Sequence, residues 1–127
     1  MNLGNYFEKR EGLGVLATAD SEGRVNAAVY ARPHFMGGKT VAFIMADRLS
    51  HSNLQSNPRA VYLFVEEGAT WQGRRLYLTR VKEEKNSPMI EVLRRRCPER
   101  GGRKGKTRFL VYFRVDRILP LVGGGES

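Results

Sequence analysis

The chain has 127 residues, the size of one domain with a hydrophobic core of its own. Hydrophobic residues make up 41% and charged residues 28%, a balance that excludes wholesale disorder. The formal net charge of +9 favours an anionic partner, either a nucleic acid or a small phosphorylated molecule.

Targeting and redox signals are few. The start, MNLGNYFEKREG, lacks the basic region and apolar run of a signal peptide, and no segment has the length of a transmembrane helix. The single cysteine, Cys97, excludes an intrachain disulfide framework and fits a reducing compartment. We therefore expect a cytoplasmic protein without a membrane partner, with one domain over residues 1–127 and a flexible tail at 123–127.

The N-terminal part of the chain predicts one short helix and two strands. Apolar residues at i, i+3 and i+4 indicate an amphipathic helix that ends by Gly12: Leu3, Tyr6 and Phe7. Gly14–Ala19 is apolar and precedes a Ser-Glu-Gly turn, so it should pair with the next strand as a hairpin. In that next strand, Val25–Met36, small apolar residues alternate with polar ones.

The middle of the chain predicts a strand, a short polar helix and another strand. Thr40–Ala46 has apolar residues on both faces, and the turn at Gly37-Gly38 joins it to the preceding strands in a three-stranded antiparallel meander. Asn57-Pro58 ends any helix that begins at Ser50. Arg59–Glu66 follows as a strand continuous enough to be buried on both faces.

The C-terminal part predicts two more strands and a helix between them. A strand at Arg74–Val81 fades into charged residues, and Ser87-Pro88 starts a helix that Pro98 ends. Phe109–Val115 alternates cleanly as the last strand. Six short strands with interspersed helices predict a small, mainly β, mostly antiparallel barrel.

The polar segment between the two central strands is a candidate anion site. Asp47, Arg48, Ser50 and His51 gather where a short helix begins, and free N–H groups and the helix dipole favour a phosphate there. A simpler interpretation makes Ser50 a helix cap, Arg48 a solvated charge and Asn57-Pro58 only a turn. On spacing alone, the plain cap is favoured.

The order of these motifs resembles the pyridoxamine 5'-phosphate oxidase-like family of FMN-binding split β-barrels. The central motif is a strand, (Asp/Ser)-Arg-x-Ser, x-Asn-Leu-x-x-Asn-Pro-Arg and a strand, within residues 40–66. The flanks GVLATAD and VNAAVYARPHFM, and the strand at Arg74–Val81, resemble the family's other strands. The resemblance covers roughly residues 3–122. It implies a six-stranded antiparallel split β-barrel, a homodimer with FMN at the subunit interface, and oxidoreductase activity.

The resemblance also implies where the flavin would bind. The phosphate would meet side chains and N–H groups at the helix start, and the ring would lie along the second and third strands. The candidate cofactor-binding residues are Asn26, Tyr30, Arg32, Ile44, Met45, Ala46, Arg48, Leu49, Ser50, His51 and Trp71. Arg32 is equally well explained as a strand-end charge before a proline. Trp71, with its neighbour Gln72, would come from the partner chain, although a plain core anchor is just as common. No catalytic residue is predicted.

The sequence departs from the family's oxidases in two places. Leu49-Ser50 stands where the oxidases commonly have Arg-Lys, and the C-terminal arginine- and histidine-containing motif that grips pyridoxal phosphate is missing. A small FMN-binding flavoprotein or flavin reductase-like enzyme of unknown substrate therefore fits better than a true pyridoxamine phosphate oxidase. Because related barrels bind F420 or haem instead, both remain alternative cofactors.

A basic run, Arg94–Arg108, supports the competing functions. It holds eight basic residues against one acid, Glu99, which allows a nucleic-acid-binding module. The run lacks aromatics for base stacking, so a solvated loop is the simpler interpretation. The loop could also close over the flavin and attract an anionic second substrate such as a nicotinamide phosphate. The two histidines, His34 and His51, lack metal-ligand spacing, so no metal site is expected.

Overall fold

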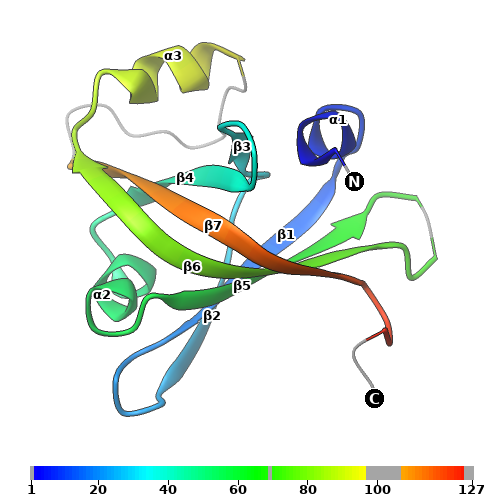
Figure 1. Ribbon diagram of the computed structural model, residues 1–127, viewed down its shortest axis with the longest axis horizontal. Coiled ribbons are helices and arrows are strands. Elements are labelled where there is room, and N and C mark those ends of the chain that lie inside the picture. Colours follow the sequence, from blue (N-terminus) through cyan, green and yellow to red (C-terminus); the bar gives the residue numbers. More distant parts are fainter. Residues whose placement is uncertain (1, 69, 97–106, 125–127) are drawn as a thin grey trace.

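The computed structural model describes residues 2–68, 70–96 and 107–124 (Figure 1). This part of the chain is mainly β with short helices, as predicted. Its elements are α1 Leu3–Glu8, β1 Gly12–Ala19, β2 Val25–Val29, β3 His34–Phe35, β4 Thr40–Ala46, α2 Leu49–Ser56, β5 Arg59–Glu66, β6 Gly73–Lys85, α3 Met89–Arg96 and β7 Arg108–Pro120. Residues 97–106, which include Cys97 and most of the basic run, lie outside the described residues, as do residues 125–127 of the predicted tail.

The strands form one antiparallel sheet in the order β2-β1-β5-β6-β7-β4-β3. Seven strands are present within the described residues where six were predicted, and the sheet is not closed. The difference lies in the predicted strand Val25–Met36, which divides into β2 and β3. Pro33 is the physical reason, because it has no N–H to donate and restricts the residue before it.

The predicted three-stranded meander is also wrong. β2 pairs with β1, whereas β4 pairs with β3 and β7, so β2 and β4 lie far apart in the sheet order. The last bond on the β2 side runs from the Tyr30 N–H to the Gly14 carbonyl, at 3.0 Å. Beyond it the chain crosses the split between the two edges of the sheet. The fold is therefore a split barrel rather than a continuous meander.

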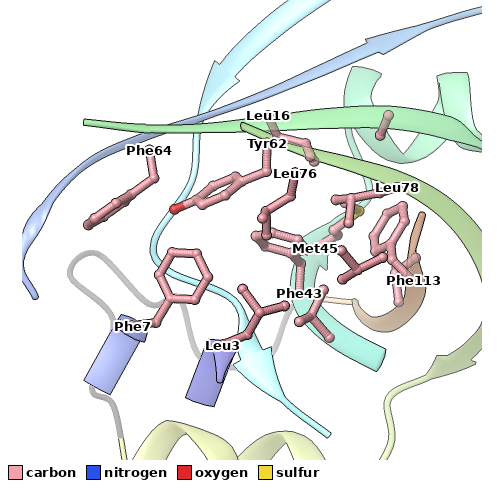
Figure 2. Close-up of a cluster of buried hydrophobic side chains, with 14 of the residues drawn as sticks. Leu3, Phe7, Leu16, Phe43, Met45, Tyr62, Phe64, Leu76, Leu78 and Phe113 are labelled. Atoms are coloured by element: carbon pink, nitrogen blue, oxygen red, sulfur yellow. The ribbon is translucent and has the colours of Figure 1, made fainter. Parts of the chain in front are cut away.

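The inner face of the curved sheet encloses one large core (Figure 2). Alternate residues of β1, β5 and β6 point inward and meet side chains from β4 and β7: Leu16, Tyr62, Phe64, Leu76, Leu78, Phe43, Met45 and Phe113. Helix α1 covers this core with Leu3, Tyr6 and Phe7. The ring of Phe7 lies edge-on to Phe64 at 5.3 Å, an arrangement that adds about 1 kcal/mol to the burial energy.

A second apolar cluster covers the outer face of β4 and β7. Ile90 and Leu93 of α3 contact Ala42, Ile44 and Leu110. Strand β4 is therefore buried on both faces, as its uninterrupted apolar sequence predicts. None of the described helices is long and apolar enough to cross a membrane.

Strand β6 is longer than its sequence pattern indicates. The charged residues Lys82 to Lys85 continue to pair with β7, after an irregularity in register between Arg80 and Lys82. Such a bulge interrupts the two-residue alternation by which a strand is recognised in a sequence. The extension carries Glu83 to α2, where its carboxylate contacts His51.

Candidate functional site

The candidate site is centred on the first turn of α2. Arg48 is the N-cap residue, in an extended conformation (φ −136°, ψ −169°), and among the described residues its side chain makes no capping hydrogen bond. The Arg48 carbonyl accepts from the Ser52 N–H at 2.9 Å, which closes the first turn. No acidic residue lies in this turn. Its N–H groups and the positive end of the helix dipole are therefore available to an anion.

Ser50 is not the helix cap that the simpler interpretation assigned to it. It lies inside α2, is only 3% exposed, and its Oγ accepts a hydrogen bond from Nδ2 of Asn26 at 3.3 Å. Asn26 is on β2, on the same face as Ala28. The structure thus brings two predicted site residues together from segments that are 24 positions apart.

A second bond from the same helix fixes α2 against the sheet. Asn53 Nδ2 donates to Thr18 Oγ1 of β1 at 3.0 Å, and both side chains are buried. A buried amide without a partner costs on the order of 1–3 kcal/mol, so this pair favours one position of α2 on β1. The first turn of α2 is consequently held over β1 and β2.

The His51 side chain points away from the helix start, toward β6 and β7. Its ring stacks on Phe109, with the centroids 3.7 Å apart and an angle of 13° between the planes. Its Nε2 lies 2.9 Å from Oε2 of Glu83. His51 therefore contributes its backbone N–H to the first turn, while its imidazole is engaged elsewhere.

The charge of Glu83 depends on these neighbours. Partial burial opposes ionisation, but hydrogen bonds from His51 and Gln55, with the nearby Arg80 charge, hold the pKa of Glu83 below its usual range. Glu83 is thus a carboxylate at neutral pH. The contact with His51 and the bond from Gln55 connect α2 to β6.

The three candidates at the end of β4 do not share a surface. Met45 lies in the inner core, fully buried, whereas Ile44 faces the opposite side beneath α3. Successive strand residues point to opposite faces, so both cannot contact one ring by their side chains. Ala46, half-buried at the end of the strand, lies two residues before the α2 cap.

Tyr30 and Arg32 both have structural contacts. The Tyr30 ring lies edge-on to Phe43 at 6.0 Å, and its carbonyl accepts from the Tyr62 hydroxyl at 3.2 Å. Nη1 of Arg32 donates to the carbonyls of Phe7, at 2.7 Å, and Arg10. This guanidinium therefore satisfies carbonyl groups at the end of α1, which favours the structural interpretation of Arg32 within one chain.

Trp71 lies in the turn between β5 and β6, at the other end of these strands from α2 (Figure 1). It is 74% exposed and adopts a positive φ of 55°, so it is not an anchor of the described core. Within one subunit, the structure does not bring Trp71 near the first turn of α2.

Sequence reasoning missed the residues that hold His51. Glu83 and Phe109 are 32 and 58 positions away from it, so their proximity depends on the register of β6 with β7. The local signals were the i, i+4 spacings of His51 with Asp47 and with Gln55. Among the described residues, no group of three or more His, Cys, Asp or Glu is arranged to hold a metal ion.

Several solved structures match the chain over most of its length. An FMN-binding protein from Syntrophomonas wolfei subsp. wolfei has a TM-score of 0.77 and 17% identity, over 95% of this chain and 84% of that one. HupZ of Group A Streptococcus has a TM-score of 0.69 and 21% identity, over 99% and 94%. A candidate pyridoxamine 5'-phosphate oxidase from Lactobacillus delbrueckii has a TM-score of 0.69 and 10% identity, over 94% and 92%. The chain has the pyridoxamine 5'-phosphate oxidase-like split-barrel fold.

The same split-barrel fold occurs in proteins named for other ligands. An F420 reductase and HutZ, the haem storage protein of Vibrio cholerae, are also similar, at 14% and 15% identity. Sequence identities this low establish the split-barrel fold but do not identify the ligand. No family model matches the sequence, and no curated protein does either.

Proposed function

We propose that this split barrel binds FMN and serves as an FMN-dependent oxidoreductase. The observation that carries the proposal is the first turn of α2, where the described part of the chain supplies neither a side-chain cap nor an acidic residue and Asn26 lies beside Ser50. An FMN-binding protein with the same fold supports the choice of FMN. When bound, the flavin supplies the redox chemistry, and the protein supplies position and electrostatics.

The residues present fit a phosphate dianion. The N–H groups of Leu49, Ser50 and His51 point toward the start of the helix, and the exposed Arg48 adds a positive charge there. Hydrogen bonds to a charged group contribute about 1.5–3 kcal/mol each, and the helix dipole up to about 1 kcal/mol at an exposed site. These groups take the place of the Arg-Lys pair that the resemblance leads us to expect.

We also propose that the protein is a homodimer, through the outer face of β2, β1 and β5. Three large apolar side chains on this face are well exposed: Val25 at 83%, Val29 at 72% and Leu13 at 53%. The register aligns Val15 with Val29 on one side and Leu63 on the other, which makes the apolar face continuous across the three strands. Continuous apolar faces are uncommon on monomers, and a second copy would cover this one.

We propose that the second substrate is an anion such as a nicotinamide phosphate, because the net charge of +9 favours anionic partners. We also propose that the protein is cytoplasmic, because a single cysteine fits a reducing compartment. F420 and haem are the second candidates for the ligand, because proteins named for them share the fold. The nucleic-acid alternative depends on a basic run that lies largely outside the described residues.

The decisive experiment is a parallel titration of purified protein with FMN, riboflavin, F420 and haem, followed by flavin fluorescence and visible absorbance. We expect FMN to bind at least tenfold more tightly than riboflavin, because riboflavin lacks the phosphate. Arg48→Ala should reduce that preference, and Lys39→Ala, which removes another exposed charge, should not. Equal binding of FMN and riboflavin, or preferential uptake of F420 or haem, would overturn the FMN assignment.

A further inference from the structure

The network around Glu83 holds α2 on its β6 side, and the buried bond from Asn53 to Thr18 holds it on β1. Both carboxylate oxygens of Glu83 are engaged by α2: Oε2 by His51 Nε2 at 2.9 Å, and Oε1 by Gln55 Nε2 at 3.1 Å. Gln55 Nε2 also donates to the His51 carbonyl at 3.1 Å. On the β2 side, the bond between Asn26 and Ser50 is long, at 3.3 Å.

The network is joined directly to the proposed phosphate donors. His51 belongs to the first turn of α2, so its N–H faces the helix start while its ring lies on Phe109 and its Nε2 meets Glu83. A displacement of the ring moves the backbone of the same residue. The ring is only 7% exposed and is confined by the stack, so the backbone of this turn has little freedom.

We propose that His51 is a positioning residue: its contacts with Glu83 and Phe109 hold the first turn of α2 in the geometry that binds a phosphate. The inference rests on the proposed function and adds a side chain that acts through the position of the helix rather than by touching the ligand. The role differs from the direct phosphate contact that the family resemblance implied for His51.

The charges around the pair define how it responds to pH. His51 faces Glu83 from β6 and Asp47, 3.8 Å from its Nδ1, from the segment before α2, whereas β7 contributes the uncharged Phe109. Arg80 of β6 faces Glu83, and its Nε is buried without a hydrogen-bond partner among the described residues. Because the pKa of Glu83 is lowered in the folded protein, the carboxylate keeps its partners until the pH falls below the usual carboxyl range.

Three variants and one control test the proposal. His51→Phe keeps a ring on Phe109 but removes the donor to Glu83; Glu83→Ala removes the acceptor, and Glu83→Gln retains one acceptor oxygen. The control is Glu84→Ala, which removes the contacts of the neighbouring carboxylate with Lys82 and Tyr112. For each protein, Kd is measured for FMN and riboflavin, and the amide shifts of Leu49 and Ser50 are followed by NMR during titration with inorganic phosphate.

We expect His51→Phe and Glu83→Ala to lower the preference for FMN over riboflavin by about tenfold, with riboflavin affinity unchanged. Glu83→Gln should recover part of the loss. The preference of the unaltered protein should fall in acid as Glu83 is protonated, and this step should vanish in Glu83→Gln. The second phosphate ionisation, near pH 6, is common to all variants.

The two proposals fail in different ways. If the unaltered protein binds neither FMN nor riboflavin, the proposed function is wrong, and the phosphate titration alone then decides the positioning role. An absence of phosphate-induced shifts at Leu49 and Ser50 would overturn that role as well. If FMN is preferred and the preference survives His51→Phe and Glu83→Ala, or falls equally in Glu84→Ala, only the positioning role is overturned.

Discussion

The outer face of β2 allows a quantitative test of the proposed homodimer. Val29 is 72% exposed in the single chain, and Val29→Ala removes two carbon groups worth about 0.8 kcal/mol each when buried. Scaled by the exposed fraction, the loss is roughly 1 kcal/mol for each subunit, or roughly 2 kcal/mol for a symmetric dimer, in which the side chain occurs twice. The dimer Kd should then rise about thirtyfold. Val25 is 83% exposed, so adding Val25→Ala should raise it by a similar further factor.

The measurement is sedimentation velocity over a wide concentration range, which gives the dimer Kd of each variant. Val92→Ala is the matched control, because Val92 is a 44% exposed valine on α3, away from the proposed interface. Circular dichroism checks that each variant remains folded. A chain that is monomeric at every concentration, or a Kd that Val25→Ala and Val29→Ala leave unchanged, would refute the assignment of this face to a second copy.

Three further predictions concern stability and are checked by urea or thermal unfolding. Arg32→Ala should lower the free energy of unfolding by roughly 2 kcal/mol and leave FMN affinity unchanged, because the guanidinium bonds two carbonyl groups near the end of α1. Unchanged stability together with weaker FMN binding would instead assign Arg32 to the flavin site. Asn53→Ala should cost about 1–3 kcal/mol, because Thr18 loses its buried partner, and an unchanged Tm would contradict the assigned bond. Burial and the hydrogen bond to Glu66 raise the pKa of Tyr6 from 10.0 to about 12. The contribution of Tyr6 to the free energy of unfolding should therefore be complete below pH 10 and should be lost as the pH rises toward 12. In Tyr6→Phe, the free energy of unfolding should fall less between pH 10 and pH 12 than in the unaltered protein. If the two proteins lose stability equally over this range, the raised pKa of Tyr6 is wrong.

The parts of the fold that could be predicted from the sequence are those whose ends are defined by neighbouring residues. Strands β4 and β5 begin and end where predicted, because continuous apolar runs and the Asn57-Pro58 break define them locally. The split between β2 and β3 was missed although Pro33 was visible, since the alternation appeared to continue through it. The length of β6 was missed because the irregularity between Arg80 and Lys82 disturbs the pattern, and only pairing with β7 keeps the charged residues in a strand.

Only those residues of the candidate site that are close together in the sequence could be predicted. The first turn of α2 and its polar residues could be located because they follow a buried strand directly, and their relation to Asn26 came from the family resemblance. The engagement of His51 by Glu83 and Phe109 could not be predicted, because it depends on the register of two long strands far along the chain. The opposite orientations of Ile44 and Met45 follow from strand alternation, but the face that each occupies was known only when α3 was found to cover one side of β4.

Strand β2 connects the two proposed surfaces. Its side chains alternate, so Asn26 faces α2, whereas Val25 and Val29 face outward on the apolar side. Among the described strands, β2 bonds only to β1, at the edge of the sheet, and an edge strand of five residues is weakly held. A partner that covers the outer face would therefore also hold Asn26 against Ser50. By thermodynamic reciprocity, phosphate binding and dimerisation should then strengthen each other.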